Sequence, residues 1–113
     1  MEEDWIMRQI KQAVNGIGYL LKKQIDAVEL GEIQLETGET VSTYTLILNC
    51  IEEKKFHEAF LLVNSLKYKL SVYDFKTVSK WFIDLLKELN QVHPDIISKE
   101  KITHYQELLN QLM

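Results

Sequence analysis

Apolar residues recur every three or four positions along most of this chain, which is the spacing of amphipathic α-helices. From Asp4 to about Gln24 they form one wide stripe, made up of Trp5, Ile6, Ile10, Ala13, Val14, Ile17, Leu20 and Leu21. Acidic residues precede this stripe and two lysines follow it, which suits the dipole of a helix at both ends. The pattern therefore predicts a first helix over residues 4–24.

Two glycines lie inside this first helix. Gly16 and Gly18 each cost a helix about 1 kcal/mol relative to alanine. They either weaken the helix locally or mark the place where a neighbouring helix approaches closely, and the sequence leaves both interpretations open.

The segment from Thr40 to Leu70 has the pattern of two antiparallel helices joined by a very short turn. A second helix is predicted over Thr40–Glu53 and a third over about Lys55–Leu70, with a charged break between them. Ala59 stands where we expect the two backbones to approach most closely. Helical hairpins of this kind usually present surfaces to other proteins and seldom carry out chemistry.

A fourth helix is predicted from the next segment. Ser71 stands three residues before Asp74, a spacing typical of a helix N-terminus. The helix should run to about Gln91 and end before His93-Pro94, because the residue before a proline is driven out of the helical region. Its apolar stripe is Phe75, Val78, Phe82, Leu85, Leu86 and Leu89.

Residues 26–39 show the least regular pattern in the chain. The segment from Asp26 to Glu39 carries five acidic residues and no Lys or Arg, and Gly31 and Gly38 interrupt it. The alternation over Ile33–Leu35 is too short to predict a sheet, because an isolated hairpin is barely stable in water. We therefore expect a loop or a short helical turn here.

A fifth and shorter helix is predicted to open at Asp95 or Ser98. The whole pattern predicts an all-α fold, a five-helix bundle that forms a single domain over residues 1–113. The first and fourth helices should pack against the helical hairpin through Ile10, Ile17, Leu21, Phe82 and Leu86.

The composition is that of an ordinary globular domain, with 46% of the 113 residues hydrophobic and 27% charged. Cys50 is the single cysteine, so no intramolecular disulfide can form and a reducing cytoplasm is the expected compartment. The acidic N-terminus differs from a signal peptide, and no apolar run approaches the roughly 20 residues of a membrane span. Heavy use of Lys, Ile, Leu, Asn and Glu suggests an AT-rich bacterial genome.

The sequence contains no recognisable catalytic, metal or nucleotide motif. His57, His93 and His104 have no His or Cys partner at a metal-ligand spacing. Cys50 lies in an apolar run, which favours a buried structural thiol over a nucleophile. We therefore expect a protein that is not an enzyme, with no catalytic residues, no cofactor and no metal.

One segment has features of a nucleic-acid surface. Lysines and aromatic residues that could bind phosphates and stack bases gather at Lys67, Tyr68, Lys69, Tyr73, Lys76, Lys80, Trp81 and Lys87. However, Lys76, Lys80 and Lys87 fall on one helical face, as on any solvated helix. The net charge of −4 and the presence of a single arginine, Arg8, also weigh against nucleic acid as the main partner.

The hairpin from about Thr40 to Leu70 resembles a tetratricopeptide repeat. The pattern of the second helix of that repeat is matched by Phe56, Ala59, Val63 and Leu66. Ile47 stands where the first helix normally has a small residue, and Ser71 replaces the closing proline. No second copy follows 34 residues later, so the other helices must cover the hairpin, because about three repeats are needed to bury a core.

A second resemblance covers nearly the whole chain. The N-terminal Asp4-Trp5-Ile6-Met7-Arg8-Gln9-Ile10 and the later Glu58-Ala59 helix start are similar to a family of small, uncharacterised helical proteins of low-GC Gram-positive bacteria. That family is known only as a domain of unknown function. The resemblance implies an all-helical, tetratricopeptide-like fold, and it brings no activity, cofactor or site residues.

The expected function is that of a non-enzymatic protein–protein interaction or scaffolding module with a protein partner. The alternative is a nucleic-acid-associated accessory protein that uses the Lys67–Lys87 face, which a salt titration would distinguish. The candidate interaction surface comprises Trp5, Met7, Arg8, Tyr73, Lys76 and Lys80.

Self-association is a further expectation. Trp5 and Met7 lie off the centre of the first apolar stripe, so they should leave apolar surface exposed, unless Trp5 folds back onto the core. The acidic Asp26–Glu39 stretch and the basic Lys67–Lys87 stretch also offer opposite charges that a second copy could match. A symmetric homodimer is the commonest way to use one patch twice.

Overall fold

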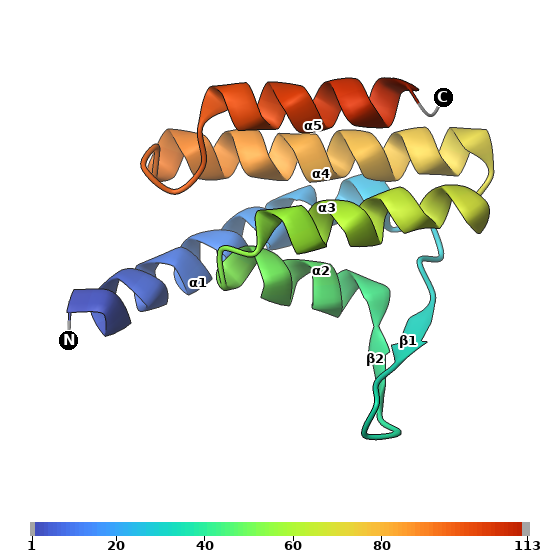
Figure 1. The fold of residues 1–113 in the computed structure, drawn as a ribbon, viewed down its shortest axis with the longest axis horizontal. Helices are drawn as coiled ribbons and strands as arrows, with labels where there is room; N and C mark the ends of the chain where they lie inside the picture. Colours follow the sequence, from blue (N-terminus) through green and yellow to red (C-terminus); the bar gives the residue numbers. More distant parts are fainter. Residues whose placement is uncertain (1, 112–113) are drawn as a thin grey trace.

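The computed structural model describes the backbone of residues 2–111 and the side chains of residues 5–111. It is predominantly α-helical, which confirms the predicted fold class, and it contains the five predicted helices (Figure 1). In chain order the elements are α1 (Glu2–Leu21), a 3₁₀ turn (Lys22–Ile25), β1 (Glu32–Gln34), β2 (Thr40–Ser42), α2 (Thr43–Glu52), α3 (Phe56–Ser65), a 3₁₀ turn (Leu66–Tyr68), α4 (Val72–Val92) and α5 (Lys99–Gln111).

The long helix α4 is the centre of the bundle. α1 and α5 pack against it, and α1 also contacts α2, which pairs with α3 in the predicted antiparallel hairpin (Figure 1). The residues expected at these contacts are buried: Ile10, Phe82 and Leu86 completely, and Ile17 and Leu21 in part.

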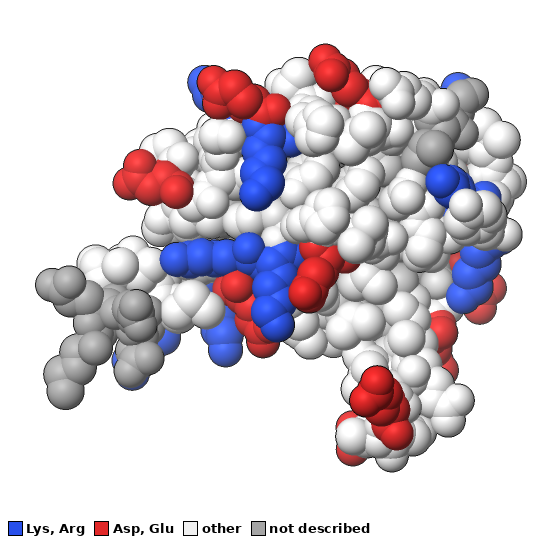
Figure 2. Space-filling view, in the orientation of Figure 1, with Lys and Arg blue, Asp and Glu red and all other residues white. Residues whose placement is uncertain are grey.

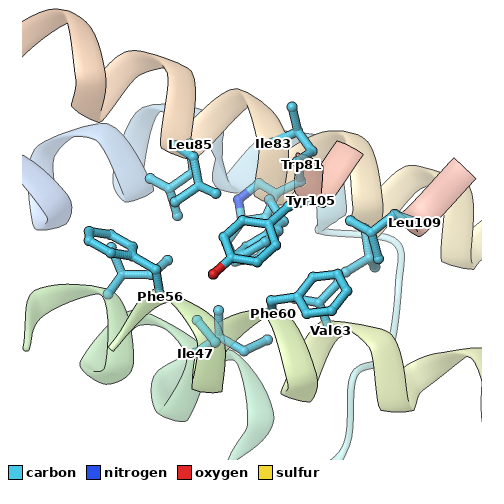
Figure 3. Packing of buried hydrophobic residues seen from close by; sticks show 14 of the residues in the cluster. Ile47, Phe56, Phe60, Val63, Trp81, Ile83, Leu85, Tyr105 and Leu109 are labelled. Carbon is cyan, nitrogen blue, oxygen red and sulfur yellow. The ribbon is translucent and has the colours of Figure 1, made fainter. Parts of the chain in front are cut away.

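Aromatic side chains connect the layers of the bundle. Trp81 of α4 is completely buried, and its ring centroid lies 5.7 Å from that of Tyr44 in α2. Tyr105 of α5 stacks on Phe60 of α3 (Figure 3), and their ring centroids are 4.8 Å apart. Pairs at these separations add to stability beyond the area they bury, so each helps to hold two helices together.

Serine side chains mark the starts of the later helices. The Ser71 hydroxyl oxygen accepts a hydrogen bond from the backbone N–H of Asp74 at 3.1 Å, which confirms the predicted start of α4. Ser98 accepts in the same way from Lys101 at 3.1 Å, so α5 opens at Ser98 and not at Asp95. Such caps satisfy N–H groups that the first turn of a helix leaves without partners.

The turn between α2 and α3 is as short as the sequence indicates. Lys54 adopts φ +65°, a left-handed conformation that is uncommon outside glycine. The backbone N–H of Lys55 reaches the Cys50 carbonyl at 2.8 Å, which closes the end of α2. The strained residue lets the chain reverse direction within three positions.

The prediction of a loop or short helical turn over Asp26–Glu39 is wrong for Glu32–Gln34, which is strand β1 and pairs with β2 in an antiparallel β-hairpin. The other residues of the segment form turns and loops, as predicted. Ile33 pairs with Val41, and a tight turn runs from Leu35 to Glu39, with Gly38 at φ +92°. The base is closed by a hydrogen bond from the Thr43 N–H to the Gly31 carbonyl at 3.0 Å. The β-hairpin projects away from the helices (Figure 1).

This β-hairpin also corrects the start of the second helix. Thr40–Ser42 is a strand, and α2 begins at Thr43, because the Ser42 hydroxyl accepts a hydrogen bond from the Thr45 N–H at 3.0 Å. The predicted third helix is likewise shorter, since its α-helical part ends at Ser65 and a 3₁₀ turn follows.

The two glycines of α1 differ in their surroundings. Gly18 is buried, and a Cβ placed there would lie 3.5 Å from a methyl group of Leu48, so α2 approaches α1 at this point. A Cβ on Gly16 would meet nothing within 4 Å. The close approach is therefore at Gly18, whereas Gly16 is a local weakness of the helix.

Candidate interaction surfaces

A hollow of about 450 Å³ lies where the start of α1, the α2–α3 turn and the end of α4 meet. We call it the α1–α4 hollow; it is lined by Ile6, Gln9, Lys54, Val92, His93, Pro94, Asp95 and Ile96. Its apolar lining is accessible, with Ile6 41% and Val92 56% exposed. Trp5, which is 61% exposed, lies one helical turn before Gln9 and therefore beside the rim.

The local sequence explains why the end of α4 lies beside the start of α1 and the α2–α3 turn. α4 stops at Val92 because His93 takes an extended backbone, with φ −135°, before Pro94. The His93 carbonyl then accepts a hydrogen bond from the Ile96 N–H at 3.1 Å, which turns the chain back beside α1. Figure 1 shows the start of α1, the α2–α3 turn and the α4–α5 connection on the same side of the molecule.

A second hollow, of about 440 Å³, lies between α4 and α5. Lys76, Lys80 and Lys87 line it together with Ser79, Ile83, Asp84, Gln106, Leu109 and Asn110. A neighbouring hollow of about 310 Å³ shares Lys87 and adds Asn90, Gln91, Lys99, Ile102 and Thr103. We call the two together the α4–α5 groove.

Some charged and polar side chains of the α4–α5 groove have no partner among the described residues. The Lys80 ammonium pairs with the Asp84 carboxylate at 2.8 Å, and among the described residues Lys76 and Lys87 form no ion pair. Ser79 is 4% exposed, and its hydroxyl oxygen has no hydrogen-bond partner in the described part of the chain. Buried polar groups are normally hydrogen-bonded, so an unpaired one beside a hollow needs an explanation.

The predicted interaction residues fall in two separate places. Trp5 and Arg8 are exposed at the start of α1, whereas Met7 is only partly exposed and packs against the core. Tyr73, Lys76 and Lys80 are exposed in the first half of α4. Because the start of α1 lies beside the end of α4, the two groups do not form one surface.

The lysine-rich segment is less suited to nucleic acid than its sequence indicates. Trp81, counted among its aromatic residues, is completely buried and cannot stack on a base. Tyr68 and Tyr73 remain exposed, at 84% and 78%, and the Lys67 ammonium lies 5.0 Å from the centre of the Tyr68 ring. Sequence analysis also missed the second wall of the α4–α5 groove, which α5 supplies.

Cys50 is half-buried and packs against the core rather than lying fully inside it. Burial raises the pKa of its thiol above the ordinary value, and the carboxylates of Glu58 and Glu53 raise it further, against a smaller opposing effect of Lys55. These surroundings disfavour the thiolate, which is the nucleophilic form of cysteine. No group of three His, Cys, Asp or Glu residues in the described part of the chain could hold a metal ion.

None of the helices described for residues 2–111 combines the length and apolar character needed to cross a membrane. Comparison of the chain with protein-family models, curated proteins and solved structures gave no match in any of the three.

Proposed function

We propose that the protein is a non-enzymatic protein–protein interaction module of the cytoplasm, and that the α1–α4 hollow binds an apolar helical segment of its partner. The observation that carries this proposal is the exposure of Trp5, Ile6 and Val92 around one hollow. Exposed apolar side chains gathered in one place usually mark an interface, and tryptophan is enriched among the residues that dominate binding energy.

The exposed area of Trp5 is large enough to contribute substantially to the free energy of binding. A tryptophan buries up to about 250 Å², so at 61% exposure roughly 150 Å² is left, equivalent to roughly 4 kcal/mol of transfer free energy. Part of that gain is lost to the entropy of association, so Ile6 and Val92 must contribute as well. The rim carries both Lys54 and Asp95, which gives no preference for a strongly charged partner.

The resemblance of α2–α3 to a tetratricopeptide hairpin supports the same class of function. We propose that the chain is a single unit of this kind whose own helices cover the hairpin. In that arrangement α1 serves both as a cover, through Ile10 and Val14, and as a binding surface, through Trp5.

Two variants and the native cytosol test the proposal. In a pull-down from that cytosol, Trp5→Ala should no longer retain the proteins that the wild-type chain retains. Tyr19→Ala, a more exposed aromatic position at the other end of α1, should still retain them. In the purified complex, acrylamide quenching of Trp5 fluorescence should fall, and Trp81 contributes little because it is buried. Identical partners for both variants would contradict a role for the α1–α4 hollow.

The alternative of a nucleic-acid-associated accessory protein has weaker support. In its favour, three lysines of the Lys67–Lys87 face line one groove. Against it, Trp81 is buried and Asp84 places a carboxylate among the lysines. Binding to an oligonucleotide that weakens steeply as salt rises would favour this alternative.

A further inference from the structure

The β-hairpin is a projecting surface of one charge. Glu32, Glu36 and Glu39 are exposed on it, and no Lys or Arg occurs between positions 24 and 53. Figure 2 shows acidic side chains at its tip. Ile33, Leu35 and Val41 share one face and are only partly buried, so some of this apolar face stays open to solvent.

The β-hairpin also lacks the support that small sheets usually have. Within residues 2–111 its sheet consists of β1 and β2 alone, and a two-stranded sheet is marginally stable in water. Its contacts with the bundle are at the base, where Lys69 reaches the Leu30 carbonyl at 3.5 Å. A second body that covered the apolar face would therefore stabilise it.

The α4–α5 groove offers the complementary features. Lys76 and Lys87 provide positive charge without an ion-pair partner among the described residues, and Ile83 and Leu109 provide an apolar floor. An acidic β-hairpin with a partly open apolar face meets both requirements, charge and apolar contact.

We propose that the acidic β-hairpin of one molecule binds in the α4–α5 groove of a second copy. The two surfaces cannot meet within one chain, because α4 and α5 lie on the side of the molecule opposite the projecting β-hairpin (Figure 1).

The contact joins two different surfaces, so its symmetry has two forms. If both β-hairpins of a pair are engaged at once, a closed dimer forms; if not, the contact repeats from copy to copy. Asp84 offsets the positive charge of Lys80, so the contact depends mainly on Lys76 and Lys87. The proposed contact goes beyond the proposed function, because neither the β-hairpin nor the α4–α5 groove includes a residue that lines the α1–α4 hollow.

Charge reversal tests the proposal on the full chain. The groove variant carries Lys76→Glu and Lys87→Glu, and the hairpin variant carries Glu36→Lys and Glu39→Lys; all four positions are exposed, so folding should be retained and circular dichroism checks it. Sedimentation velocity should show self-association of the wild-type chain at micromolar concentration in low salt. For each variant alone, the dissociation constant of self-association should be at least about tenfold higher than for the wild type, because like charges then face each other.

Mixing supplies the decisive result. An equal mixture of the two variants should recover association, because acidic β-hairpins again face basic grooves and basic β-hairpins face acidic grooves. The control pair Lys11→Glu and Lys23→Glu makes the same charge change at exposed positions elsewhere and should leave association intact.

A wild-type chain that stays monomeric in low salt overturns the proposal, as does a mixture that fails to recover association. A labelled single-stranded oligonucleotide could also be tested. If it binds the wild-type monomer and does not bind the groove variant, the result overturns the proposal in favour of nucleic acid as the occupant of the groove.

Discussion

Replacing Ala59 by leucine tests the packing of the helical hairpin directly. Ala59 is 0% exposed and lies on the face of α3 that Phe56 and Val63 also bury, one turn to either side. If space were available, the added methylene groups would stabilise the fold by about 0.8 kcal/mol each. Ala59 borders neither of the hollows described above, and cores are packed as densely as organic crystals. Strain should therefore exceed the transfer gain, with a net loss of about 1–3 kcal/mol.

The assay is a urea titration followed by far-ultraviolet circular dichroism. Ala59→Leu should lower the transition midpoint without changing the slope of the unfolding free energy, and each kcal/mol should lower the melting temperature by roughly 4–8 °C. His57→Leu, at an exposed position of the same helix, serves as the control and should change stability by less than about 0.5 kcal/mol. A neutral Ala59→Leu with an unchanged slope would refute the reasoning, because it would show free space beside residue 59.

Three further predictions concern single residues. Lys54→Gly should raise the free energy of unfolding by about 0.5–1 kcal/mol in the same titration, because it relieves φ +65°, whereas Lys55→Gly, where φ is −89°, should give no gain. Gly16→Ala should add up to about 1 kcal/mol, because the new methyl group meets nothing within 4 Å and alanine favours the helix; a loss of stability would mean that the site is crowded. Cys50 should react slowly with iodoacetamide at neutral pH and accelerate only in more alkaline solution than an ordinary thiol, because its pKa is raised; equal rates in the folded and urea-unfolded chain would contradict this.

The helices could be predicted from the sequence because their signals are local. The apolar period of α4 and the spacing of Ser71 and Asp74 lie within a few residues of the structure they specify. The helix end at Val92 follows from one proline. Each of these features is decided by neighbours in the chain, so no knowledge of the tertiary structure is needed.

The β-hairpin could not be predicted in the same way. Its stability depends on Ile33 meeting Val41 across a turn, and strands of three residues give too short an alternation to be recognised. Val41 and Tyr44 are also spaced as on a helix, which led to the wrong start of α2. One local signal was overlooked: Ser42, three residues before Thr45, has the spacing of the helix cap that the structure shows.

The candidate surfaces were predictable only in part. The off-stripe position of Trp5 correctly indicated exposure, whereas the hollow beside it requires the ends of α1 and α4 to meet. Trp81 was placed on the lysine-rich face, although it follows Val78 by three positions and shares its buried side. A central helix such as α4 is covered by several neighbours, so its buried face is wider than a single apolar stripe indicates.

The fold alone explains the charged residues on one side of the proposed contact but not those on the other. The lysines of α4 occupy a face left to solvent, so any soluble helix would carry polar residues there. The β-hairpin has no such explanation, because its exposed positions would accept lysine as readily as glutamate, and exposed strands commonly carry lysine to prevent unwanted pairing. Here every charged residue from Asp26 to Glu39 is acidic. This uniform charge on a projecting element that stays partly open to solvent is the stronger indication that the β-hairpin meets a basic surface of another molecule.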